Sequence, residues 1–160
     1  MSRLDSFIRR MTAQRDILNQ VANQALLPES GNILELGLGN GRTYSHLREI
    51  FPERRIIVFD RAVMAHSSCI PQESNIVLGE IAETAKGFIG SNAAFAHADI
   101  GSGNDEIDEQ TLQWLPELMA GLLMTNGIAL SGLPLETNQL ESLPIPEGID
   151  KMRYFLYRKS

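Results

Sequence analysis

Three glycines at alternate positions are the most informative chemical feature of this sequence. Gly37, Gly39 and Gly41 follow the apolar run NILEL and precede a helix-like segment. Glycine adopts positive φ readily and lets a ligand approach the backbone where a Cβ would collide. A turn between a buried strand and a helix also lies where ligands bind, at the carboxyl edge of a parallel sheet. The sequence therefore predicts a ligand-binding turn here.

The spacing of these glycines disfavours two common nucleotide-binding turns. The Walker phosphate-binding pattern ends in Gly-Lys-Ser/Thr, whereas Arg42 follows the last glycine of this chain. The dinucleotide fingerprint has its third glycine three positions after the second, and that position is again Arg42. An NAD-binding oxidoreductase is therefore the less favoured hypothesis.

Acidic residues stand beside the turn and at the ends of the next apolar runs. Glu35 lies within an apolar strand, where a carboxylate is costly without a partner, so a functional role is favoured over chance. Asp60 ends RIIVFD, 19 residues after Gly41. Glu80 closes NIVLGEI, and it is equally well explained as the first residue of a helix, where the dipole favours an acid.

The order ELGLGNG, Asp60 and Gly79-Glu80-Ile81 resembles the motifs of class I S-adenosylmethionine-dependent methyltransferases, over roughly residues 30–133. The resemblance implies that Glu35 holds the methionine amino group, directly or through water. It implies that Asp60 accepts both ribose hydroxyls, that Glu80 accepts from the adenine amino group, and that Ile81 packs on the adenine ring. The cofactor implied is S-adenosyl-L-methionine, bound over the turn formed by Gly37, Gly39 and Gly41.

The acceptor side of such a site should follow the fourth apolar run, in HADIGSGNDE. Asp99 is the candidate polar active-site residue, with a helix N-cap or Asx turn as the alternative. His97 is a candidate base near neutral pH, although a satisfied core histidine is the more frequent situation. Nucleic-acid and protein-amide N-methyltransferases carry Asn/Asp-Pro-Pro-aromatic at this place. Asp99 is followed instead by Ile-Gly-Ser, which argues against N6-adenine and glutamine chemistry.

The elements that must position these residues follow an alternating pattern. Five short apolar runs are predicted strands, at 32–38, 55–60, 75–81, 93–100 and 127–133, with a sixth at 151–159. The segments 42–51, 61–69, 80–90 and 105–124 are predicted to be helical. This alternation is typical of an α/β fold with a parallel sheet covered on both faces.

With the resemblance, the prediction is a three-layer Rossmann-like methyltransferase fold. Its sheet is mostly parallel, with six or seven strands and an antiparallel last strand. Only 18 residues separate Leu133 from Met152, so the sheet could lack a strand that its relatives have. Residues 1–28 carry an apolar helical stripe, interrupted by Gln14 and Arg15, and are predicted to form a helical lid that is broken near 12–14.

Composition sets the remaining expectations. A chain of 160 residues is predicted to be one cofactor-binding domain over 1–160. The net charge of −6 disfavours nucleic acid and anionic membranes as partners, and a lone Cys69 cannot form an internal disulfide. No run of about 20 apolar residues and no signal-peptide core are present, so a cytoplasmic location is expected. No convincing metal-ligand spacing is found.

The leading hypothesis is a small methyltransferase acting on a small-molecule acceptor, with a homodimer as a possible assembly. A non-catalytic sensor or scaffold that binds S-adenosylmethionine is the alternative from another class, because no base is evident and the Pro-Pro motif is absent. The acceptor and its nucleophilic atom stay open.

Overall fold

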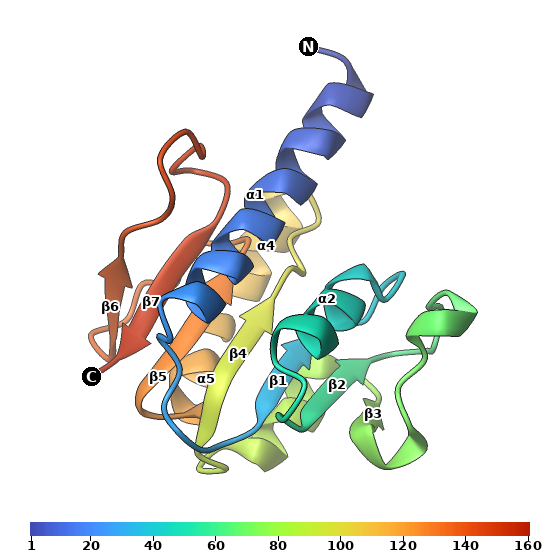
Figure 1. The fold of residues 1–160 in the computed structure, drawn as a ribbon, viewed down its shortest axis with the longest axis vertical. Helices are drawn as coiled ribbons and strands as arrows, with labels where there is room; N and C mark the ends of the chain where they lie inside the picture. Colours follow the sequence, from blue (N-terminus) through green and yellow to red (C-terminus); the bar gives the residue numbers. More distant parts are fainter.

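Seven strands make up the sheet of this protein, and the computed structural model describes all residues from 1 to 160. The strands are β1 (Ile33–Leu36), β2 (Ile56–Asp60), β3 (Ile76–Leu78), β4 (Ala93–Ala98), β5 (Leu123–Ser131), β6 (Leu140–Leu143) and β7 (Phe155–Lys159). Their order in the sheet is β3-β2-β1-β4-β5-β7-β6 (Figure 1).

The direction of the strands fixes where a ligand can bind. The first five strands pair in parallel, whereas β7 pairs antiparallel with both β5 and β6. Because β1 has β2 on one side and β4 on the other, the order of the strands reverses at β1. A crevice at the carboxyl ends of β1 and β4 follows from this reversal. The predicted fold, with its antiparallel last strand, is confirmed.

Five α-helices flank the sheet: α1 (Arg3–Asn23), α2 (Arg42–Ile50), α3 (Ile81–Thr84), α4 (Asp105–Leu112) and α5 (Leu115–Leu122). Three short 3₁₀ helices, η1 (Ser67–Cys69), η2 (Glu73–Asn75) and η3 (Ala85–Phe88), connect them. One core cluster packs α1 and α2 against one face of the sheet, and a second packs α5 and η3 against the other (Figure 1). The strands are therefore buried on both faces, which explains their near-continuous apolar runs.

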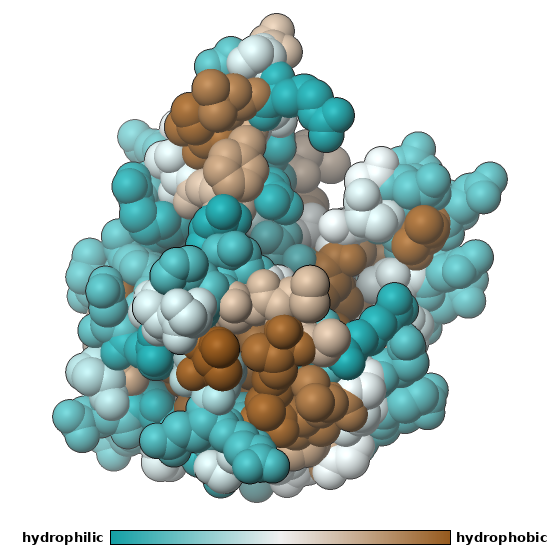
Figure 2. All heavy atoms as spheres, turned by 90° about the vertical axis from the view of Figure 1, so that its right-hand side faces the viewer, coloured by the Kyte–Doolittle hydropathy of each residue, from teal (hydrophilic) through white to brown (hydrophobic).

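The N-terminal helix is continuous from Arg3 to Asn23, so the predicted break near residues 12–14 is wrong. Ser2 and Asp5 form a reciprocal capping box that begins the helix. Its inner half is buried in the core, whereas its outer half projects from the body, with Leu4 66% and Ile8 52% exposed. Figures 1 and 2 show this end standing clear of the sheet, with apolar side chains on its surface.

Three other local predictions are corrected. The segment 61–69 is not a helix but an irregular connection that ends in η1. The segment 105–124 forms two helices, because Pro116 lies in the first turn of α5 and begins a new helix there. The sheet does not lack a strand, since β6 fits between Leu133 and β7.

No helix of the structure combines the length and the apolar character that crossing a membrane requires.

Candidate functional site

The main pocket lies at the carboxyl ends of the parallel strands, with a volume of about 720 Å³. Its walls come from the glycine turn after β1, the ends of β2 and β4, the start of α3, the face of α4 and the middle of α1. This is the place that the reversal of strand order predicts for a ligand. The volume lies within the range typical of small-molecule and cofactor sites.

Asp60, at the end of β2, holds the glycine turn in place. Its Oδ2 accepts hydrogen bonds from the backbone N–H groups of Leu38 at 2.8 Å and Gly39 at 3.0 Å, while Oδ1 accepts from its neighbour Arg61 at 2.6 Å. A carboxylate offers about four acceptor positions, and three are used here. Asp60 therefore shapes the turn besides lining the pocket.

The glycines of the turn play different parts. Gly37 and Gly39 line the pocket, and a Cβ at Gly39 would meet no atom within 4 Å, so the space beside it is open. Gly41 does not line the pocket, although it is predicted as a cofactor-binding residue. With φ of 86° it begins α2, and a Cβ there would lie 2.5 Å from the Cβ of Cys69. Position 41 requires a glycine because Cys69 approaches it closely, a contact that cannot be predicted from the sequence.

Glu35 and His97 form a buried pair at the floor of the pocket. They are direct partners in the register of β1 and β4, and the Nδ1 of His97 lies 2.9 Å from both carboxylate oxygens. Burial raises the pKa of Glu35, an effect that His97 opposes. Burial alone would lower the pKa of His97, but the charge and hydrogen bond of Glu35 outweigh it and raise that pKa.

The pairing shows which of the two residues can contact a ligand. Glu35 lines the pocket, although only 2% of its surface is exposed. His97 is the partner that a buried carboxylate requires, and the sequence alone did not identify it. His97 is fully buried and does not line the pocket. Its surroundings are those of a satisfied core histidine, and it can act on the reaction only by positioning Glu35 and Gln14.

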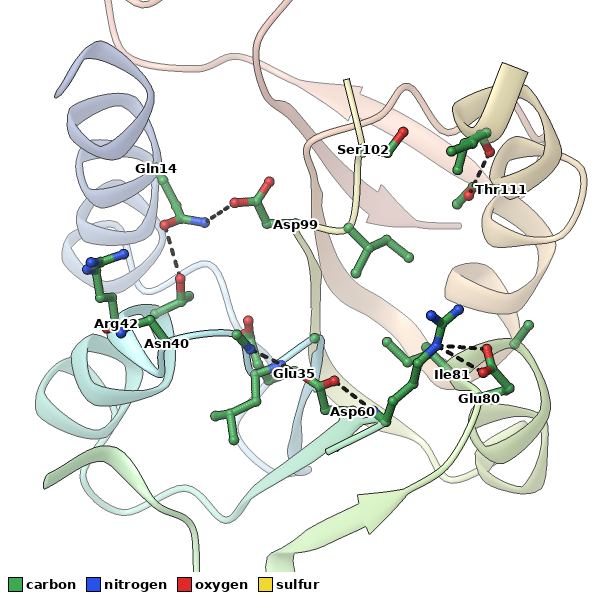
Figure 3. Close-up of a pocket in the computed structure, with 18 of the residues that line it drawn as sticks. Gln14, Glu35, Asn40, Arg42, Asp60, Glu80, Ile81, Asp99, Ser102 and Thr111 are labelled. Carbon is green, nitrogen blue, oxygen red and sulfur yellow. Dashed lines mark hydrogen bonds and ion pairs between the residues drawn. The ribbon is translucent and has the colours of Figure 1, made fainter. Parts of the chain in front are cut away.

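Gln14 connects α1 to this floor. Its Nε2 donates to Oδ2 of Asp99 at 3.2 Å and lies 3.4 Å from Nε2 of His97, while its Oε1 accepts from the hydroxyl of Thr43 at 3.0 Å. Figure 3 shows Gln14 and Asp99 pointing toward each other across the pocket. In the sequence, Gln14 is distinguished only by interrupting the apolar stripe of the N-terminal helix, and that interruption is the signal of a polar side chain directed toward the site.

Asp99 lies in the pocket wall at the end of β4, and it is neither an N-cap nor an Asx turn. Besides Gln14, it pairs with Arg10 of α1 at 3.6 Å. The hydroxyl of Tyr154 is the one buried side-chain polar atom of the chain with no hydrogen-bond partner. Burial, followed by the nearby charge of Asp99, raises the pKa of Tyr154. Arg10 and Tyr154 carried no signal in the sequence.

The opposite end of the pocket carries an exposed ion pair. Glu80 begins α3 but makes no capping bond, and instead pairs with the Nε of Arg61 at 2.9 Å. Glu80 and Ile81 both line the pocket, as the sequence led us to expect (Figure 3). Arg61 is a third lining residue that sequence reasoning did not consider.

Several polar side chains near the glycine turn lie outside the main pocket. Tyr44 is buried and packs beneath the guanidinium of Arg48, so it does not reach the pocket. Cys69 is a buried thiol against Gly41, and His46 bonds to Asn19. No group of three or more His, Cys, Asp or Glu side chains could hold a metal ion.

A family model described as S-adenosyl-L-methionine methyltransferase matches residues 1–159. The chain belongs to this family. Its similarity extends to a crystal structure of an S-adenosyl-L-methionine methyl transferase from Silicibacter pomeroyi DSS-3, with 40% identity and a TM-score of 0.90. That match covers 100% of this chain and 99% of the other.

More distant structures share the fold of this methyltransferase. A Podospora anserina methyltransferase bound to S-adenosylhomocysteine matches with 13% identity and a TM-score of 0.61, over 100% of this chain and 80% of the other. Methanococcus jannaschii fibrillarin, a pre-rRNA processing protein, matches with 14% identity and a TM-score of 0.55, over 91% and 75% of the two chains. Among curated proteins, none matches significantly.

The family match confirms the predicted cofactor, S-adenosyl-L-methionine, and the pocket of this methyltransferase suits it. The open space beside Gly39 lets a ligand approach the backbone, and acids stand at both ends of the pocket, Glu35 on one side and Glu80 on the other. These acceptors match the amino groups that the cofactor carries at its two ends. When bound, the cofactor supplies an electrophilic methyl group on a sulfonium.

Proposed function

We propose that this methyltransferase transfers the methyl group of S-adenosyl-L-methionine to a small molecule whose nucleophilic atom lies beside Asp99. The observation that carries the proposal is the double contact of Gln14 with Asp99 and Thr43. These hydrogen bonds connect α1 to the end of β4 and to the start of α2. The three side chains thereby form a wall at the proposed acceptor end of the pocket. The space left there suits a small acceptor better than a folded macromolecule.

The proposed cofactor contacts follow the order of the strand ends. Glu35 receives the methionine amino group at the floor, next to its partner His97. The ribose lies beside Asp60, whose Oδ1 accepts one backbone hydrogen bond and keeps capacity for a hydroxyl. Glu80 receives the adenine amino group, and Ile81 packs on the ring. Arg61 then limits the freedom of Glu80 through their ion pair.

Asp99 has the position of a general base. Its carboxylate lines the pocket, and Gln14 and Arg10, both from α1, contact the same carboxylate oxygen, Oδ2. A base is required only for an acceptor that must lose a proton, and the protein otherwise contributes orientation and proximity. His97 acts as a positioning residue, because it contacts Glu35 and Gln14 rather than the pocket.

Charge supports a small acceptor over RNA. The chain has 14 basic and 20 acidic residues, and nucleic-acid binding depends on a basic surface. The likeness to fibrillarin, at 14% identity, concerns the fold alone.

The test is transfer of a radiolabelled methyl group with three acceptor pools: a low-molecular-weight metabolite extract, total RNA, and a protein fraction. We expect label in the metabolite pool. Asp99→Asn should slow transfer by about 10²–10⁴-fold if Asp99 acts as a base, whereas Asp105→Asn, outside the pocket, should not. Label that enters only RNA or protein would overturn the proposal.

A further inference from the structure

A second, smaller pocket adjoins the main one between α1 and α2. Its volume is about 220 Å³. Met11, Gln14, Arg42 and Thr43 line both pockets. The two spaces are therefore separated by the thickness of single side chains, and we refer to the smaller one as the side pocket.

The chemistry of the side pocket differs from that of the main pocket. Phe7, Met11 and Leu18 give it an apolar lining, and its ionisable side chains are those of Arg15, Arg42 and His46. It has no acidic residue, whereas the main pocket has four. Apolar walls with cationic groups alone suit a ligand that has an apolar body and a negative charge.

Arg42 is the cation that is free to bind such a ligand. Its guanidinium makes no ion pair or hydrogen bond within the chain and lies over the ring of Phe7, 5.6 Å from the ring centroid. A guanidinium that stacks on an aromatic face keeps its N–H edge for bidentate contact with a carboxylate. Figure 3 shows Arg42 extending from the start of α2 toward α1. By contrast, Arg15 already pairs with Asp16 at 2.9 Å.

The distribution of charge along the chain agrees with an anionic ligand at this place. Residues 1–15 carry four arginines and one aspartate, whereas the rest of the chain carries ten basic and nineteen acidic side chains. The half of α1 that flanks the side pocket is thus a basic segment on an acidic protein. A local positive field of this kind raises the concentration of anions at its surface.

The size of the side pocket limits the ligand. An apolar cavity of about 150 Å³ holds one benzene molecule, so about 220 Å³ has room for a single ring with a carboxylate. We infer that the side pocket binds the apolar, carboxylate-bearing part of the methyl acceptor, with Arg42 as the specificity residue. The inference rests on the proposed function. Gln14, which joins the two pockets and contacts Asp99 at 3.2 Å, lies between this anchored part and the reacting end.

The experiment uses the full chain saturated with S-adenosylhomocysteine and three probes of similar shape: benzoate, benzyl alcohol and benzylamine. Binding is followed by protein-observed NMR. Benzoate should bind with a dissociation constant of about a millimolar, as expected for so small a ligand, and at least about tenfold more tightly than the other two probes. Arg42→Gln should weaken benzoate about tenfold or more. Arg9→Gln removes the same charge from a site that lines neither pocket, and it should leave benzoate binding unchanged.

The alternative outcomes are distinct from failure of the proposed function. Equal affinities for benzoate and benzyl alcohol, equal losses in the two variants, or displacement of S-adenosylhomocysteine by benzoate would each overturn the inference while cofactor binding persists. A loss of S-adenosylhomocysteine affinity in Arg42→Gln as large as the loss of benzoate affinity would assign Arg42 to the cofactor and would also overturn it. Failure of the wild-type chain to bind S-adenosylhomocysteine at all would contradict the proposed function itself.

Discussion

Nδ1 of His97 lies 2.9 Å from both carboxylate oxygens of Glu35, a residue 62 positions earlier in the chain. The two residues are register partners in parallel strands, so their side chains leave the sheet on the same face. Gln14 then contacts the far side of the imidazole and carries the connection to Asp99. One polar network thus joins the floor of the cofactor pocket to the N-terminal helix.

The pair makes stability depend on pH in a defined direction. Because the fold raises the pKa of His97, its protonated form is favoured in the native state, mainly through Glu35 acting against burial. The stabilisation is fully present below the ordinary histidine pKa of about 6.5 and is lost as pH rises through the raised pKa. His97→Gln should cost about 3–5 kcal/mol at pH values near 6 and progressively less as pH rises through the raised pKa of His97, as measured by urea unfolding over a pH series. His66→Gln, at an exposed site, is the control, and an equal or larger cost at higher pH would contradict the prediction.

Gln14 should stabilise the folded state through its hydrogen bonds, although it is a polar residue in a buried position. Replacing it with leucine leaves the buried Nε2 of His97 without its neighbour and removes one contact each from the partly buried Asp99 and Thr43. A buried polar group that loses its partner costs about 1–3 kcal/mol, so Gln14→Leu should lower the free energy of unfolding by that order. Gln24→Leu, exposed at the end of the same helix, is the matched control. The role of Gln14 would be refuted by equal unfolding free energies in the two variants.

Gly39 and Gly41 should respond differently to alanine. Both have positive φ, 50° and 86°, so each alanine carries about 1–2 kcal/mol of backbone strain. At Gly41 the new methyl group also collides with Cys69, whereas at Gly39 it enters open space. Overpacking adds about 1–3 kcal/mol, so Gly41→Ala should unfold at clearly lower denaturant concentration. The opposite order would show that the approach of Cys69 is not the constraint.

Glu80 should matter for binding and not for stability. Its pair with Arg61 is exposed on both sides, and such pairs contribute at most about 1 kcal/mol. Glu80→Ala should leave unfolding almost unchanged but weaken S-adenosylhomocysteine by about three- to tenfold, the loss expected for a single polar contact. Glu83→Ala removes an acid from the same helix outside the pocket, so it should change neither quantity. Equal binding by the two variants would favour the helix-dipole explanation of Glu80.

The features that could be predicted from the sequence are those encoded by local pattern. Alternation of apolar runs and helical segments predicts the parallel sheet. An acid within the strand before the glycine turn, Glu35, and acids at the ends of the next strands, Asp60 and Glu80, were predicted as site residues, and all three reach the pocket. Each of these signals depends on a residue and its near neighbours, so no knowledge of the tertiary structure is required.

The features that could not be predicted depend on contacts between distant segments. Strand register decides that Glu35 meets His97, and no local pattern encodes it. The need for glycine at position 41 comes from Cys69, which approaches from a loop that the sequence suggested was helical. Gln14 and Arg10 reach the site because α1 packs on one face of the sheet and extends past the carboxyl ends of the strands, an arrangement that only tertiary contacts define.

The most direct test of the account is calorimetric titration of the wild-type chain with S-adenosylhomocysteine, alongside Asp60→Ala. We expect one molecule bound per chain, with an affinity that falls at least about tenfold in the variant, since Asp60 holds the turn and is proposed to accept hydrogen bonds from the ribose. Absence of binding by the wild-type chain at millimolar concentration, or equal binding by the two proteins, would contradict the placement of the cofactor at the glycine turn.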